Sequence, residues 1–185
     1  PGGAFFECTA LKSVTISQTT ANIGRSAFQG CKALESVTPF LPNTVTSVGI
    51  SAFRGTSNLK LPLSLKAPGL TNIGVDGETD WMLGQFYESG ITSVDLSGSG
   101  LTNIGQRTFS DCKQLQTVKL PRSLMTFGYD TFCDSYNLMD IQFQSSLDLA
   151  TVDPPFMGVR MEWRKNAPSC GRLVYPAGDP VWEKY

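Results

Sequence analysis

The sequence predicts a β-rich solenoid of about six stacked coils, with a parallel sheet along one side and a cap at the C-terminal end. Three observations predict it. A phenylalanine recurs at steps of 23, 25, 33, 23 and 23 residues. An apolar-glycine pair precedes most of these phenylalanines, and a short segment in which apolar and polar residues alternate follows them. Periods in the twenties are typical of solenoids, in which each unit contacts only its neighbours.

The recurring phenylalanines are expected to form a ladder through the core. A single unit is too small to bury its own ring, whereas stacked units about 4.8 Å apart share a continuous interior. The members of this ladder are Phe5, Phe28, Phe53, Phe86, Phe109 and Phe132. The alternation in SVTIS (13–17) and SVDLS (93–97) predicts strands with one buried and one wet face. The glycine after each Ile is expected to adopt a turn conformation that a side chain would resist.

Three segments share several positions in phase: IGRSAFQGCKALESV (23–37), VGISAFRGTSNLKL (48–61) and IGQRTFSDCKQLQTVKLPRSLMTFG (104–128). They resemble the BspA-like, or Treponema pallidum-type, leucine-rich repeat, and the resemblance covers residues 1–146. It implies a right-handed leucine-rich-repeat superhelix. Residues 147–185 resemble the family's usual ending, and we expect them to cap the core and the open sheet edge. The first repeat lacks its Ile-Gly pair, so we expect it to be truncated, with further repeats or a cap upstream.

Composition narrows the classes of function. With 15 basic and 16 acidic residues, the net charge of −1 argues against a nucleic-acid footprint or electrostatic attachment to a membrane. The absence of histidine removes Ser-His-Asp and Cys-His nucleophiles and most zinc and iron sites. The chain also has neither a P-loop nor a dinucleotide-binding fingerprint. The sequence therefore predicts no enzyme, no cofactor and no metal site.

Five cysteines are scattered along the chain without a C-x-x-C pair, and this does not resemble a disulfide framework. Cys8, Cys31 and Cys112 each follow a ladder phenylalanine by three residues, an interior position at which an inert buried thiol is expected. Because stacking places Cys8 beside Cys31, a bridge between these two remains an alternative.

The segment VDGETDWM (75–82) interrupts the pattern, since the fourth repeat has eight more residues than the fifth. Asp76, Glu78 and Asp80 alternate as at the start of a calcium loop, but Trp81 stands where an EF-hand needs glycine. A solvated surface loop is the first alternative. A binding loop that presents Trp81 is the second, because recognition residues are often carried by loops on a rigid scaffold.

The outward-facing residues of the strands are the other candidate binding site. They are Thr15, Asp95, Lys119 and Gln142, with Thr38 expected in the same row. The row is mixed in charge and consists mostly of short side chains, so the alternative is a face that merely keeps the protein soluble.

The resemblance implies export to the bacterial cell surface, with a signal or anchor upstream of residue 1. It also implies a non-catalytic role in adhesion or protein binding, in which the partner is a host or bacterial surface protein. Two other functions remain open. A glycan-binding module would need Trp81, Tyr87 and Trp163 to form an exposed platform, whereas an architectural spacer would need only a bland polar surface.

Overall fold

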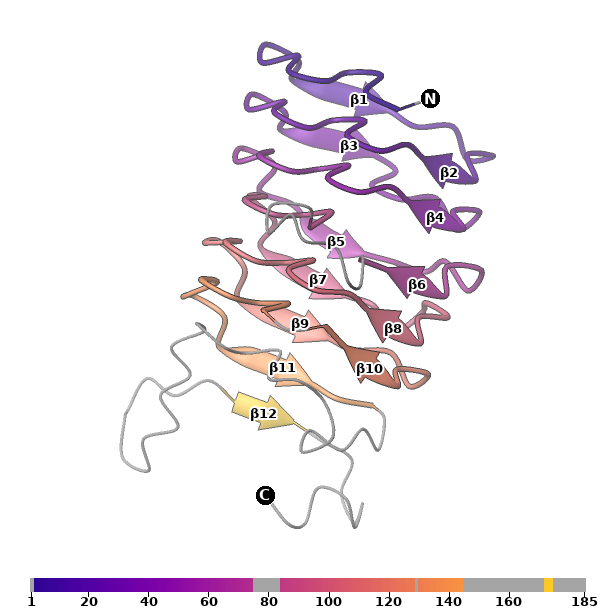
Figure 1. Cartoon of the computed structure of the whole chain (residues 1–185), viewed down its shortest axis with the longest axis vertical. Helices are drawn as coiled ribbons and strands as arrows, with labels where there is room; N and C mark the ends of the chain where they lie inside the picture. The colour runs from indigo at the N-terminus through magenta and orange to yellow at the C-terminus, as the bar shows by residue number, and fades with distance from the viewer. Residues whose placement is uncertain (1, 75–83, 129, 145–171, 175–185) are drawn as a thin grey trace.

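The computed structural model describes residues 2–74, 84–128, 130–144 and 172–174. Figure 1 shows an elongated stack of similar coils, with strand β1 at one end and strand β12 at the other. The structure contains no helix among these described residues. Its strands are Ser13–Thr15 (β1), Asn22–Ile23 (β2), Ser36–Thr38 (β3), Ser47–Val48 (β4), Pro62–Ser64 (β5), Asn72–Ile73 (β6), Ser93–Asp95 (β7), Asn103–Ile104 (β8), Thr117–Lys119 (β9), Thr126–Phe127 (β10), Asp140–Gln142 (β11) and Arg172–Val174 (β12).

The strands lie in two columns along the stack (Figure 1). One column consists of the sheet β1-β3 and the sheet β5-β7-β9-β11-β12, and the other of the sheets β2-β4 and β6-β8-β10. Each pairing is parallel and joins equivalent residues of successive repeats, as in Val94 with Val118 and Val118 with Ile141. This register confirms the predicted solenoid with parallel strands. Strand β12 extends the longer sheet by pairing with β11, while the predicted capping role of residues 147–185 remains a prediction.

The phenylalanines stack through the interior. Successive ring centroids are 5.4, 5.1, 5.3, 5.3 and 5.7 Å apart, with interplanar angles of at most 20°. Five of the six rings are buried, but Phe5 is 39% exposed and departs from the expectation of a core residue. The reason is geometric, because Phe5 has a neighbouring ring on one side only. Phe40, which is outside the predicted ladder, also stacks on Phe53 with centroids 5.2 Å apart.

The glycines that follow the Ile or Val of β2, β4, β6 and β8 correct the sequence-based interpretation. Of these, Gly74 has a positive φ of 101°, as expected, and the other three do not. At Gly49 and Gly74 close approach between coils also excludes a side chain. A Cβ on Gly49 would lie 2.4 Å from the backbone nitrogen of Arg25, and one on Gly74 would lie 2.4 Å from the Cα of Gly105. Non-glycine residues with left-handed φ lie elsewhere, two residues before or after ladder phenylalanines.

Two prolines interrupt the first column. The residue directly after the strand donates its backbone N–H to the next coil at 2.8 Å in the case of Leu65 and Leu96. After β3 this residue is Pro39, which has no N–H. Where Ser36 donates to the preceding coil at 3.2 Å, strand β5 begins with Pro62. Among the described residues no strand pairing joins β3 to β5, or β4 to β6. In the first column the expected single sheet is therefore two sheets, because the ladder lacks two of its donors. The second column is interrupted at the same boundary.

The coils nevertheless stay joined on the phenylalanine side of the same boundary. The N–H groups of Phe28 and Gly30 each donate to the following coil at 2.8 Å, and the rings of Phe28 and Phe53 stack at 5.1 Å. The interruption is therefore confined to the two strand columns, and the stack of rings continues through it.

Candidate binding surface

The candidate surface is built by the third residue of strands β1, β3, β5, β7, β9 and β11, which we call the outer row. It consists of Thr15, Thr38, Ser64, Asp95, Lys119 and Gln142. Because alternate residues of a strand face opposite sides, the middle residue of each strand points to the core while the outer row faces away from it. The buried middle residues include Leu63, Val94 and Val118. In the outer row Thr15, Thr38, Ser64 and Lys119 are exposed, and Asp95 and Gln142 are half-buried.

The register brings the predicted residues together in two groups. Thr15 pairs with Thr38 in the short sheet. Asp95, Lys119 and Gln142 follow one another in the longer sheet, where Ser64 precedes them. The prolines at the β3–β5 boundary separate the two groups, so the outer row is not the continuous surface that the sequence pattern indicates. Ser64, which the pattern did not single out, belongs to the larger group because it pairs with Asp95.

Asp95 is the electrostatic centre of the larger group. Its Oδ1 accepts hydrogen bonds from the hydroxyl of Ser97 at 2.6 Å and from the Ser97 backbone N–H at 3.0 Å. Its Oδ2 lies 3.9 Å from the Lys119 ammonium. Burial opposes ionisation, but these hydrogen bonds and the charges of Lys119 and Lys66 outweigh it, so the pKa of Asp95 lies below its usual range. The row therefore presents a carboxylate beside an ammonium.

Asp76, Glu78, Asp80 and Trp81 lie outside the described residues, and so does Trp163. Of the aromatic residues proposed for a glycan platform, only Tyr87 is described. It is half-buried, and the guanidinium carbon of Arg54 lies over its ring, 5.6 Å from the centroid. One face of the Tyr87 ring is therefore already covered by a cation.

The cysteines divide by environment. Cys31 and Cys112 are buried, and each thiol donates a hydrogen bond at 3.0 Å to a ladder carbonyl of the preceding coil, from Phe5 and Phe86 respectively. Burial raises the pKa of both thiols. Cys8 is exposed, contrary to the expectation of a buried position, because it lies in the first described coil, beside the exposed end of the ladder. Cys8 and Cys31 are both free thiols in this structure.

Sequence reasoning missed that the position three residues after the ladder phenylalanine is a column of small donors. Thr56 and Ser89 occupy it in the middle coils, and their hydroxyl oxygens lie 3.1 Å apart. Ser135 occupies it in a later coil and donates to the carbonyl of Phe109 at 2.8 Å. Cysteine, threonine and serine thus all occupy this position as compact hydrogen-bonding residues, which the spacing alone would have indicated.

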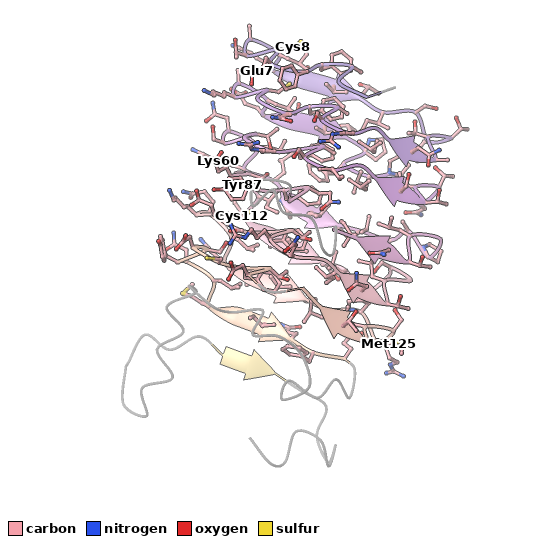
Figure 2. All side chains as sticks on the ribbon, viewed as in Figure 1. Glu7, Cys8, Lys60, Tyr87, Cys112 and Met125 are labelled. Carbon is pink, nitrogen blue, oxygen red and sulfur yellow. The ribbon has the colours of Figure 1, made fainter. Side chains whose placement is uncertain are left out.

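An open pocket of about 350 Å³ lies along the edge of the stack that is formed by the turns after the ladder phenylalanines, which we call the turn edge. It forms because Ser57 and Gly90 are small and occupy adjacent coils between Lys32 and Lys113. The ammonium of Lys113 lies 3.2 Å from the Asp111 carboxylate. Figure 2 places Lys60, Tyr87 and Cys112 along this same edge, and Met125 on the opposite one. The pocket offers charges of both signs in open solvent.

Within the described ranges no group of three Cys, Asp or Glu side chains is close enough to hold a metal ion. The described part of the chain also contains no helix with the length and apolarity needed to cross a membrane.

The chain matches the protein family described as "BspA type Leucine rich repeat region". Six copies match, over residues 1–75 and 83–151. No curated protein matches the chain significantly.

The fold resembles those of solved leucine-rich repeat proteins, of which two are described here. The Treponema pallidum leucine-rich repeat protein is 25% identical, with a TM-score of 0.60, and the match covers 76% of this chain and 60% of that one. A leucine-rich cell surface protein from Faecalibacterium prausnitzii A2-165 is 26% identical, with a TM-score of 0.59, over 78% of this chain and 36% of that one. The chain thus spans less than two thirds of either protein's length.

Proposed function

The chain belongs to the BspA-type leucine-rich repeat family, and on that premise we propose that it is a non-catalytic protein of the bacterial cell surface that binds another protein across its outer row. Leucine-rich repeat proteins are typically protein–protein interaction scaffolds. The observation that carries the proposal is the in-register group Ser64, Asp95, Lys119 and Gln142, held on a sheet whose opposite face is the buried core. The cell-surface description of the Faecalibacterium protein supports the location.

The physical case rests on rigidity and charge. Residues in register lie about 4.8 Å apart, so a partner meets a fixed array whose backbone does not need to be ordered on binding. Asp95 and Lys119 are neighbours of opposite sign. Their charges favour a partner with the complementary pair and disfavour one that places like charges against them, which provides specificity more than affinity.

The test is a binding screen followed by a matched pair of variants. The biotinylated protein is screened against arrays of extracellular-matrix proteins, bacterial surface proteins and glycans. Lys119→Glu then reverses a charge in the outer row, and Lys113→Glu reverses one on the turn edge. The two lysines are comparable because each is exposed and lies near an aspartate.

We expect a protein ligand whose affinity falls about tenfold or more with Lys119→Glu and little with Lys113→Glu. An affinity that responds only to Lys113→Glu would remove the outer row as the site. A ligand found only on the glycan array would replace protein binding by glycan binding, and the absence of any ligand would favour an architectural spacer.

A further inference from the structure

The pocket on the turn edge interrupts a pattern that neighbouring coils share. In three successive coils the second residue after the ladder phenylalanine is acidic, and these residues are Glu88, Asp111 and Asp134. All three have the same left-handed backbone, with φ of 57°, 57° and 58°, so their Cα–Cβ bonds are placed alike. The turn edge therefore carries one carboxylate per coil in this part of the stack.

Two of the three carboxylates have a donor two residues further along the chain. The carboxylate of Asp111 lies 3.2 Å from the ammonium of Lys113. The carboxylate of Asp134 accepts a hydrogen bond of 2.6 Å from the hydroxyl of Tyr136. The repeat thus places an acidic side chain and its donor next to each other on this edge, and the donor is a cation in one coil and a phenol in the next.

Glu88 differs because its donor position is occupied by Gly90, which has no side chain. The fold requires glycine there, since a Cβ on Gly90 would lie 2.3 Å from the carbonyl oxygen of Ser57. The described part of the chain shows no ion pair and no side-chain hydrogen bond of Glu88. Glu88, Gly90 and Ser57 all line the pocket of about 350 Å³. The pocket is therefore the space that a donor to Glu88 would fill.

The charges around the pocket favour a cation beside Glu88. The hydrogen bond and charge of Asp111 raise the pKa of the Lys113 ammonium, and the charge of Glu88 acts in the same direction. The charge of Lys113 is itself paired with Asp111. Lys32, the other cation that lines the pocket, lies two coils before Glu88, a separation of about 10 Å at which salt screens most of its repulsion. An ammonium or guanidinium is therefore the donor that suits this position best.

We propose that the turn-edge pocket is a second binding site, which receives the side chain of a lysine or arginine from a partner protein and pairs its charge with the carboxylate of Glu88. The partner's side chain takes the place that Lys113 has beside Asp111 in the next coil. The volume of the pocket falls within the range of small-ligand sites and accommodates one long side chain. The site lies on the turn edge and not on the outer row, so the inference goes beyond the proposed function and does not depend on it.

The experiment uses a pair of peptides that differ in one charge. The probe is a capped Gly-Gly-Arg-Gly-Gly peptide, and the matched peptide has citrulline in place of arginine, which keeps the length of the side chain but removes its charge. Binding to the full chain is followed by the shifts of backbone amides in ¹⁵N NMR spectra. One ion pair in open solvent supports only weak binding, so we expect saturable shifts at millimolar concentration, centred on Ser57, Glu88 and Gly90, and about fivefold weaker binding of the citrulline peptide.

Protein variants place the peptide in the pocket. Glu88→Gln removes the charge of an exposed side chain, and it should weaken binding of the arginine peptide about fivefold and abolish its advantage over the citrulline peptide. Glu7→Gln is the matched control. Glu7 is also exposed, also lies two residues after a ladder phenylalanine and also has a left-handed φ, of 56°, but it is not part of the pocket. Ser57→Lys brings an ammonium of the chain itself into the pocket and should weaken peptide binding by a similar factor.

Three results would overturn the inference. They are the absence of shifts at the pocket amides at millimolar concentration, equal binding of the citrulline peptide, and a loss of binding with Glu7→Gln as large as that with Glu88→Gln. The comparison of the two peptides needs no variant, so it decides the question even if a variant fails to fold. Lys119 lies outside the pocket, and Lys119→Glu should leave peptide binding unchanged. The outer-row proposal and this inference can therefore fail independently of each other.

Discussion

Removing one ring from the middle of the phenylalanine ladder should destabilise the stack more than removing the ring at its end. Phe109 is fully buried between Phe86 and Phe132, with ring centroids 5.3 and 5.7 Å away. Phe5 is 39% exposed and has one ring neighbour, Phe28, 5.4 Å away. The pair of variants Phe109→Ala and Phe5→Ala therefore compares the same chemical change at two degrees of burial.

The magnitudes follow from burial and ring pairing. Truncating a buried phenylalanine costs about 3–5 kcal/mol, and the loss of two stacked neighbours at Phe109 places that variant in the upper part of the range. Phe5 keeps about two fifths of its surface in solvent in the folded protein and loses one stacked pair, so its truncation should cost about 2 kcal/mol. Because m is about 1–3 kcal/mol/M in urea, the two midpoints should differ by about 1 M.

The assay is urea unfolding of the full chain, followed by far-UV circular dichroism. Phe109→Leu serves as a control, because it retains most of the apolar volume and should fall between wild type and Phe109→Ala. If Phe109→Ala proved no more destabilising than Phe5→Ala, the ring stack would not be the main packing element of the core.

Three further outcomes follow from close contacts. Gly49→Ala should cost about 2–4 kcal/mol in the free energy of unfolding, measured by the same urea titration, because its Cβ would meet the backbone of the neighbouring coil at 2.4 Å. Cys112→Ser should cost less than Cys112→Ala, by about 1 kcal/mol, since a hydroxyl keeps a donor for the carbonyl that the thiol meets at 3.0 Å; equal costs in thermal unfolding would contradict this. Ser97→Ala removes the 2.6 Å hydrogen bond to Asp95 and should raise the pKa of that carboxyl, measured by carboxyl-carbon NMR. Because the pKa of Asp95 is lower in the folded than in the unfolded state, its ionised carboxylate stabilises the fold at pH values above the unfolded-state pKa. This stabilisation is lost as the pH falls through the folded-state pKa, so the variant should lose it at a higher pH than the wild type.

The phenylalanine ladder and the parallel strand register could be predicted because they depend on residues that recur at the same position of each repeat. The spacing of Phe28, Phe53 and Phe109 indicates which rings are equivalent, and stacking then makes successive rings neighbours, as Phe28 and Phe53 are. Phe5 has the same letter and spacing, but its burial depends on whether rings lie on both sides. The alternation SVD likewise predicted the outward position of Asp95, whereas its hydrogen bonds with Ser97 required the local backbone path.

What could not be predicted depends on contacts between coils. The pattern shows Gly49 as one of a series, and a turn conformation was the simplest reason for it. The reason found in the structure is that a Cβ at position 49 would collide with the backbone of Arg25, a residue of the neighbouring coil. Pro39 and Pro62 were equally visible in the sequence. Only the register shows that each occupies a position at which other coils donate a backbone N–H.

The missing rungs between β3 and β5 also bear on how the chain unfolds. In a solenoid, stability is passed from coil to coil through nearest-neighbour interfaces, so a weakened interface is where cooperativity ends. Across this boundary the described residues are joined by bonds on the phenylalanine side, by the Phe40 ring and by the Gln85 side chain on the Val48 carbonyl, whereas β5, β7, β9 and β11 share an unbroken ladder. Residues 2–48 should therefore form a separate foldon whose amides exchange at lower free energy than those of Val94 and Val118. We therefore expect one continuous core to unfold as two units of different stability.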